Sequence, residues 1–160
     1  SPPQPPFAAG RPDDPQSPPS RLPMTLEEAQ KRYPGATTFK FGDNAMLCAE
    51  LLNLVRAGHK TATCGALRDF QAGGEEMPAV GRCDIALNWD GTPALVIRTI
   101  EVTQRRFCEV TEDFALAEGE NESLGAWQRG HEAYFARNGG FSPDMMLVCE
   151  RFELVEDLAP

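Results

Sequence analysis

The sequence predicts a small α+β domain, in which a curved mixed sheet or barrel is flanked by helices. Two long strand patterns, at residues 82–89 and 94–105, are joined by Asp90-Gly91, which is a strong hairpin signal. A further strand pattern covers residues 145–155 near the end of the chain. Amphipathic helical patterns are dispersed among these strands, which favours an α+β arrangement.

The N-terminal part of the chain predicts a disordered tail, because 9 of the 14 prolines lie in residues 1–23. Such a segment has too little apolar surface to bury. We therefore expect a proline-rich tail over residues 1–22 and a single domain over residues 23–160. The tail lacks the apolar centre of a signal peptide, and no run approaches the length of a membrane span.

The first elements of the domain have clear start and stop signals. Thr25 to Glu28 form a capping box for a short helix that ends near Pro34-Gly35, and a short strand with Phe39 and Phe41 follows. Residues 45–57 then predict a helix, which Asp43 or Asn44 can cap. Its apolar face is formed by Leu47, Cys48, Leu51, Leu52 and Val55.

Lys60 and Thr63 follow this helix directly, because Gly58 is placed to end it in a left-handed turn. A buried, neutral lysine could accept the proton of a threonine hydroxyl and make it a nucleophile. Extended chain alternates faces, so the two side chains need a bulge or turn between them to meet in one cavity. The alternative is a solvated lysine that carries little packing, followed by strand-forming threonines.

Three later segments contain candidate site residues. Residues 67–78 predict a loop that either faces the substrate or only connects two elements. Arg98 falls in an apolar stripe with Val96, Ile100 and Val102. It lies either at the solvent-exposed end of the strand or, as we expect, points into a pocket. Trp89, beside the hairpin turn, is a candidate either for base stacking or for closing the barrel end.

Residues 107–128 hold six acidic and no basic residues, a composition typical of a solvated face. Ser123 can cap a helix that continues to about Arg137. Trp127, His131 and Phe135 recur every four residues and form one stripe on that helix. A histidine in such a stripe is more often packed than catalytic.

Charge and cysteine content limit the partners. The net charge is -9, which argues against tight binding of duplex DNA while allowing a local basic pocket for a nucleotide or a short single strand of RNA. The five cysteines form no CxxC pair, so we expect reduced thiols in a cytoplasmic protein and no metal site. Cys64 is a candidate nucleophile only if a basic partner lies nearby. The oligomeric state is not predicted.

The hexapeptide Gly58-His59-Lys60-Thr61-Ala62-Thr63 resembles the glycine-x-lysine-x-x-threonine signature of the ASCH domain family, which is related to PUA domains. Phe41-Gly42-Asp43 precedes the helix as in the longer ASCH proteins, and the likeness covers about residues 37–156. It continues in order with Glu118-Gly119-Glu120, Ser123-Leu124, Trp127, His131 and Phe135. The resemblance implies a PUA-like β-barrel with helices flanking a cleft.

The resemblance also implies an activity. Small ASCH amidohydrolases remove the acyl group from N4-acetylcytidine with a lysine, a threonine and a glutamate, which match Lys60, Thr63 and Glu118 here. We therefore expect a hydrolase of an acylated nucleoside. The alternatives are a single-stranded RNA ribonuclease, as another ASCH protein is, and a non-catalytic RNA- or nucleotide-binding module. This chain departs from the small enzymes in its length, in Cys64-Gly65 and in the segment that contains Gly119, which leaves the substrate open.

In the expected mechanism Lys60 accepts the proton of Thr63, and Glu118 orients Lys60 or relays a proton to the leaving amine. An ionised glutamate raises the pKa of a neighbouring lysine, so either burial outweighs that effect or Glu118 is itself the base. No cofactor is expected, and a divalent metal ion enters only under the ribonuclease alternative. The expected substrate-binding residues are Arg98, Trp89, Glu120, Ser123 and His131.

Overall fold

The computed structural model describes residues 22–71 and 73–159 of the chain. The predicted tail, residues 1–22, therefore lies outside the described residues except for its last position. The elements follow one another as α1 (Leu26–Arg32), β1 (Thr37–Phe39), α2 (Ala45–Arg56), β2 (Ala62–Ala66), the 3₁₀ helix η2 (Leu67–Phe70), β3 (Cys83–Leu87), β4 (Pro93–Arg106), the 3₁₀ helix η3 (Phe107–Glu109), α3 (Glu112–Ala117), α4 (Leu124–Arg137) and β5 (Met146–Asp157).

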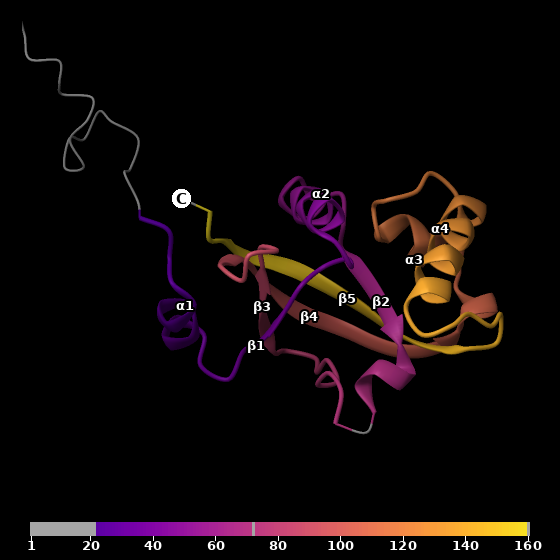
Figure 1. Ribbon diagram of the computed structural model, residues 1–160, viewed down its shortest axis with the longest axis horizontal. Helices are drawn as coiled ribbons and strands as arrows, with labels where there is room; N and C mark the ends of the chain where they lie inside the picture. The colour runs from indigo at the N-terminus through magenta and orange to yellow at the C-terminus, as the bar shows by residue number, and fades with distance from the viewer. Residues whose placement is uncertain (1–21, 72, 160) are drawn as a thin grey trace, which may run out of the picture.

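The five strands form one mixed sheet in the order β1-β3-β4-β5-β2. β1 pairs with β3 in parallel, and the other three pairs are antiparallel. The sheet curls into a half-barrel, with α2 and the α3–α4 pair above the strands and α1 at the end near β1 and β3 (Figure 1). This architecture confirms the predicted α+β class with a curved mixed sheet and flanking helices.

Three helices begin at the residues that the sequence predicts as caps. Thr25 and Glu28 exchange hydrogen bonds in the predicted capping box of α1. Asn44, rather than Asp43, caps α2 by accepting a backbone hydrogen bond of 2.9 Å. Ser123 caps α4 in the same way at 3.1 Å. These bonds satisfy amide groups that the first helical turn leaves without a partner.

The helix α3 is not predicted by the sequence pattern. Thr111 caps it, and Phe114 and Ala115 are buried, although the acidic run around them suggests a solvated face. Six residues are fewer than two helical turns, which is too short for a helical period to be recognised. The helix matters for the site because Glu118 directly follows it.

Apolar side chains form three clusters, one under each helical region. The cluster under α2 includes Phe41, Leu51, Leu52, Val55, Ala86, Leu95, Ile97 and Phe152. The cluster under α3 and α4 includes Ala62, Phe107, Phe114, Trp127, Phe135, Leu147 and Cys149. The cluster under α1 includes Ala29, Ile85, Leu87, Val96 and Leu158. The strands β3 and β4 therefore contribute side chains to two clusters on opposite faces of the sheet.

Two register shifts interrupt the pairing of β4 with β5. The first skips Val155 of β5, and the second skips Ile100 of β4. The bulge at Ile100 moves the following residues to the opposite face, so Val102 does not continue the face of Val96 and Arg98. Arg98 is exposed, and its guanidinium donates a hydrogen bond of 2.9 Å to the Glu153 carboxylate. The predicted apolar stripe and the pocket position of Arg98 are therefore wrong.

The cysteines differ in their burial. All five cysteines are free, with Cys48 and Cys149 buried and Cys108 exposed. Within residues 22–71 and 73–159, no helix combines the length and the apolar character that crossing a membrane requires.

Phe135→Ala should lower the free energy of unfolding by about 3–5 kcal/mol, because it empties a buried aromatic site. Phe135 is 2% exposed and packs edge-on against Phe107, with ring centroids 6.3 Å apart. Urea unfolding followed by circular dichroism measures the change. Ile100→Ala, at a position that is 51% exposed, is the control and should change stability by less than about 0.5 kcal/mol. Equal unfolding midpoints for the two variants would contradict the packing described for α4.

Candidate functional site

Lys60 lies in the turn between α2 and β2, and its side chain points into the protein. Gly58 adopts a φ of 81°, after which the backbone N–H of Lys60 donates to Leu54 O at 3.1 Å. Lys60 is only 2% exposed, so the alternative interpretation, a solvated lysine that carries little packing, is wrong. Because β2 begins only at Ala62, strand alternation does not apply to Lys60, and both Lys60 and Thr63 line one cavity.

Glu118 follows α3 and is brought against the turn after α2 by close backbone contact. The Thr61 N–H donates to Ala117 O at 2.8 Å. Gly119 has a φ of 78°, and a Cβ placed there would lie 2.3 Å from His59 O. Only glycine allows this approach without strain. The glycine between the two glutamates therefore determines how closely these segments pack.

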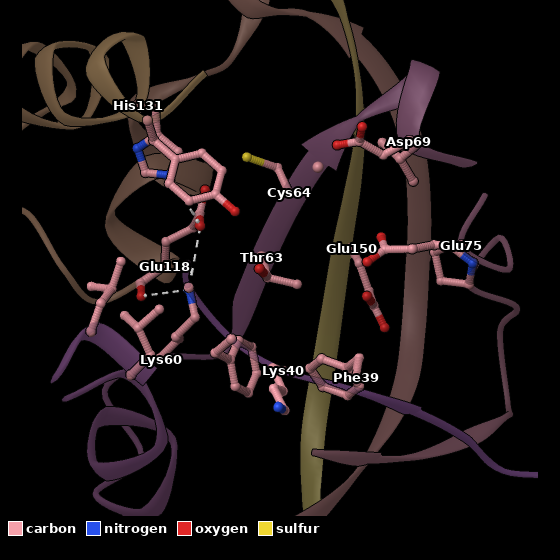
Figure 2. A pocket seen from close by; sticks show the side chains of 18 of the residues that line it. Phe39, Lys40, Lys60, Thr63, Cys64, Asp69, Glu75, Glu118, His131 and Glu150 are labelled. Carbon is pink, nitrogen blue, oxygen red and sulfur yellow. Dashed lines mark hydrogen bonds and ion pairs between the residues drawn. The ribbon is translucent and has the colours of Figure 1, made fainter. Parts of the chain in front are cut away.

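The Lys60 amine faces the carboxylates of Glu118 and Glu120. Figure 2 shows the Lys60 side chain directed toward Glu118. Its Nζ lies 3.3 Å from Glu118 Oε1, 3.3 Å from the Glu118 carbonyl oxygen and 3.0 Å from Glu120 Oε2. Burial lowers the pKa of Lys60, but the charges of Glu118 and Glu120 outweigh burial, and the pKa is raised. The side chain therefore stays an ammonium ion at neutral pH.

Glu118 is 1% exposed, and both oxygens of its carboxylate have partners. Trp127 Nε1 donates to Oε2 at 2.7 Å, while His131 Nε2 lies 3.5 Å from Oε1. Burial raises the pKa of Glu118, but Lys60 and His131 outweigh burial and lower the pKa to about 2. The carboxylate is therefore ionised and held in one orientation.

The stripe predicted on α4 is confirmed, and it supports the site. The rings of Trp127 and His131 are stacked with centroids 4.2 Å apart, and His131 Nδ1 lies 3.0 Å from Trp127 O. Burial lowers the pKa of His131, but Glu118 outweighs burial, and the pKa is raised. His131 is thus both a packed residue and a neighbour of Glu118.

Thr63 and Cys64 reach the same cavity from β2 (Figure 2). Thr63 pairs in register with Glu150 on β5, and side chains of opposed residues share one face of a sheet. Burial is the main cause that raises the pKa of the Cys64 thiol well above its usual range. The interpretation of Cys64 as a thiolate nucleophile is therefore not supported.

The cavity has a volume of about 680 Å³ and an acidic lining. Eight carboxylates line it: Glu50, Asp69, Glu75, Glu76, Asp84, Glu118, Glu120 and Glu150. Four of the other lining side chains are Lys or Arg, and each is already engaged: Lys40 with Trp89 O, Lys60 with Glu118 and Glu120, Arg82 with Asp84, and Arg137 with Asp43. The segment 67–78 contributes several lining residues, so it forms a wall of the cavity as well as a connection.

One group of lining residues has the chemistry of metal ligands. One ligand atom from each of Cys64, Glu118 and His131 lies within 4.8 Å of the other two. The three residues come from β2, the end of α3 and α4, which the sequence spacing alone does not connect.

Residues 37–156 match the family model described as ASCH domain. The chain belongs to the ASCH domain family. An ASCH domain of known crystal structure from Lactobacillus crispatus JV V101 is similar to this chain, with 31% sequence identity and a TM-score of 0.69. The similarity covers 82% of this chain and 86% of the Lactobacillus chain. A protein of known crystal structure from Enterococcus faecalis V583 is 35% identical, covers 77% of this chain and 78% of that chain, and has a TM-score of 0.70.

These similarities confirm the resemblance inferred from the hexapeptide at residues 58–63 and the PUA-like form of the fold. No protein with a curated description is significantly similar to this ASCH domain.

The ASCH domain brings five of the eight predicted site residues together. Lys60, Thr63, Glu118, Glu120 and His131 all line the cavity, whereas Arg98, Ser123 and Trp89 do not. Ser123 serves as a helix cap. Trp89 is 41% exposed at the hairpin, where the Lys40 amine lies 4.9 Å from its ring centroid. Hairpin and strand patterns cannot place these residues relative to a cavity formed by other elements.

Glu150 is a cavity residue of the ASCH domain that the sequence pattern does not indicate. It lies in β5 opposite Thr63, and its Oε1 accepts a hydrogen bond of 2.5 Å from Thr99 Oγ1. Burial raises its pKa. The sequence signal that could have indicated Glu150 was an acidic residue within an apolar strand pattern.

Gly119→Ala should disrupt the site of the ASCH domain, because the new Cβ would collide with His59 O. We expect a loss of more than about 2 kcal/mol in unfolding free energy, since the left-handed conformation alone costs an alanine roughly 1–2 kcal/mol. Gly58→Ala is a matched control, because Gly58 has a φ of 81° and no atom within 4 Å of the added Cβ. Chemical denaturation of both variants isolates the collision. If both lose the same stability, the two segments are not packed as described.

Proposed function

We propose that this ASCH domain is a hydrolase that removes the acyl group from an acylated nucleoside such as N4-acetylcytidine. The observation that supports this most directly is that Lys60, Thr63 and Glu118 line one cavity of about 680 Å³. That volume lies within the roughly 300–1,000 Å³ of small-molecule sites. Side chains of a nucleophile, a cation and a carboxylate in one small cavity suit the cleavage of an amide bond.

The charge of the cavity favours an uncharged nucleoside over an RNA strand. Binding a strand requires cations that can contact phosphates. Among the residues that the structure describes, the four Lys and Arg side chains of the lining are engaged with other groups, and eight carboxylates line the same cavity. A nucleoside brings no phosphate, and its amide and hydroxyl hydrogens can donate to carboxylates.

In the proposed reaction the Lys60 ammonium stabilises the negative charge that develops on the carbonyl oxygen. A preformed cation suits this role better than the role of a base, because Glu118 and Glu120 raise the pKa of Lys60. The positive charge of Lys60 lowers the pKa of Glu118 in the resting site. When the oxyanion forms beside Lys60, it partly neutralises this charge, and the pKa of Glu118 rises. The carboxylate becomes a stronger base at the moment when Thr63 must lose its proton.

The covalent steps then involve Thr63. Its Oγ1 attacks the carbonyl carbon, and its proton passes to the Glu118 carboxylate. Collapse of the tetrahedral intermediate breaks the bond between carbon and nitrogen, and the leaving amine takes the proton from Glu118. Water then attacks the acyl ester on Thr63 while Glu118 accepts its proton. Cleavage of the ester bond releases the carboxylic acid, and the proton passes from Glu118 to Thr63 Oγ1.

Incubation of the purified protein with N4-acetylcytidine, and separately with an unstructured single-stranded RNA, tests the proposal. Chromatography should detect cytidine and acetate in equal amounts and leave the RNA at full length. RNA fragments without any deacylation would show a ribonuclease instead. If neither substrate changes although both bind, the protein is a binding module and the proposed hydrolase activity is wrong.

A further inference from the structure

We infer that Cys64, Glu118 and His131 form a binding site for a divalent transition metal ion of the zinc type, with a fourth coordination position open to the cavity. Their ligand atoms all lie within 4.8 Å of one another. The inference concerns metal binding and does not rest on the proposed function. A bound ion would occupy the Glu118 carboxylate that acts as the base in the proposed reaction, so that reaction belongs to the metal-free protein.

The hydrogen bonds of His131 leave its Nε2 as an acceptor that can bind a cation. Nδ1 lies 3.0 Å from Trp127 O, and a carbonyl oxygen only accepts, so Nδ1 carries the hydrogen. Nε2 then faces Glu118 Oε1, which also only accepts. Two acceptors that face each other require a proton or a metal ion between them.

The separation of these two atoms matches a metal ion. His131 Nε2 and Glu118 Oε1 are 3.5 Å apart, beyond the range of a good hydrogen bond. In a tetrahedral zinc site, with bonds of about 2.0–2.3 Å, neighbouring ligand atoms lie about 3.3–3.7 Å apart. The Cys64 sulfur lies within 4.8 Å of His131 Nε2 and of Glu118 Oε1. A movement of roughly 1 Å would bring it to the spacing of a third tetrahedral ligand.

Hydrogen bonds to neighbouring groups orient His131 and Glu118 in the way that is usual for metal ligands. A histidine that binds a metal commonly donates its other ring N–H to a carbonyl oxygen, as His131 does to Trp127. The second oxygen of Glu118 accepts a hydrogen bond of 2.7 Å from Trp127 Nε1, which fixes the carboxylate with Oε1 toward His131. One residue, Trp127, thus orients both ligands.

The type of ion follows from the donor atoms and the charge. Sulfur, nitrogen and oxygen together suit zinc, whereas calcium and magnesium prefer oxygen ligands alone. A thiolate and a carboxylate neutralise a divalent ion, and Lys60 retains Glu120 as its counter-ion at 3.0 Å. Three protein ligands with one open position are typical of zinc sites that hold water or substrate.

Cobalt(II) titration of the full chain, after removal of metals with a chelator, tests the inference by absorption spectroscopy. We expect one equivalent to produce a thiolate-to-cobalt charge-transfer band together with the intense visible bands of a tetrahedral ion. Zinc should displace the cobalt and abolish both.

Two variants test whether the Cys64 thiolate is a ligand of the metal ion. Cys64→Ser should remove the charge-transfer band and weaken zinc binding by more than about 100-fold, because loss of a residue that merely orients a ligand already costs about 10–100-fold. Cys108→Ser, at an exposed thiol, should leave the band and the affinity unchanged. Thermal unfolding monitored by circular dichroism must show that both variants fold.

Absence of any cobalt spectrum in the wild-type protein would mean that His131 and Glu118 share only a proton, and it would overturn the inference. A band that survives in folded Cys64→Ser, or that is lost in Cys108→Ser, would overturn it equally. Hydrolysis of N4-acetylcytidine is measured separately, so failure of the metal site and failure of the proposed function are distinguishable.

Discussion

Lys60→Met is expected to abolish turnover and to lower the free energy of unfolding by about 3–5 kcal/mol, the usual cost of removing one partner from a buried ion pair. Methionine keeps the length and apolar stem of the side chain while removing the ammonium group. Glu118, which is 1% exposed, then loses the cation that lies 3.3 Å from its Oε1. Chemical denaturation and the deacylation assay measure the two effects.

The double variant Lys60→Met/Glu118→Gln separates stability from catalysis. It removes the uncompensated carboxylate, so most of the lost stability should return while turnover stays absent. Recovery of activity in the double variant would contradict the proposed mechanism. A Lys60→Met protein that unfolds at the wild-type midpoint would show that the ion pair contributes nothing to stability.

Acid should reduce the difference between wild type and Lys60→Met. The pKa of Glu118 is lowered from 4.5 to about 2, so the stability that it contributes is present above pH 4.5 and is lost as the pH falls toward about 2. Without Lys60, burial favours the protonated carboxyl group, and the variant gains stability as the pH falls. Unfolding measured across this pH range should show the two curves converging.

Thr63→Val should lower deacylation on the order of a thousandfold or more, because it removes the proposed nucleophile and keeps the branched shape. If the attacking group were a water or a ribose hydroxyl, Thr63 would supply at most one hydrogen bond. The loss would then be nearer tenfold, from about 1–1.5 kcal/mol. The rate constant for release of cytidine distinguishes the two cases.

Thr61→Val is the matched control, because Thr61 is two residues away and exposed. Its hydroxyl donates only a weak hydrogen bond, at 3.3 Å, to Ala117 O. Turnover by this variant should stay within a few-fold of wild type, since one such bond contributes about 1 kcal/mol. Near-normal deacylation by folded Thr63→Val would refute the nucleophilic threonine and assign the attack to water.

Local signals in the sequence were sufficient to predict most of the fold. The capping box at Thr25, the caps at Asn44 and Ser123, and the turn at Asp90-Gly91 depend on neighbouring residues alone, and each forms as predicted. Prediction failed for α3 because six residues hold too little periodicity. It failed for the apolar stripe from Val96 to Val102 because the bulge at Ile100 depends on how β4 pairs with β5.

The site itself could be predicted only in part. The lysine hexapeptide and the segment around Gly119 identify Lys60, Thr63 and Glu118, which lie far apart in the sequence but line one cavity. The charge state of Lys60 could not be predicted, because it depends on whether burial or two carboxylates dominate. Glu150 and Cys64 enter the cavity through strand pairing that no local pattern specifies.

The strand order determines when this site can assemble during folding. β2 lies at an edge of the sheet, and its partner there is β5, whose residues are made last among the strands. During synthesis the segment with Lys60 and Thr63 therefore leaves the ribosome well before the strand that holds it in place. Closing so long a loop is entropically costly and makes folding slow. A nascent or C-terminally shortened chain that lacks β5 should retain α2 but have no formed cavity.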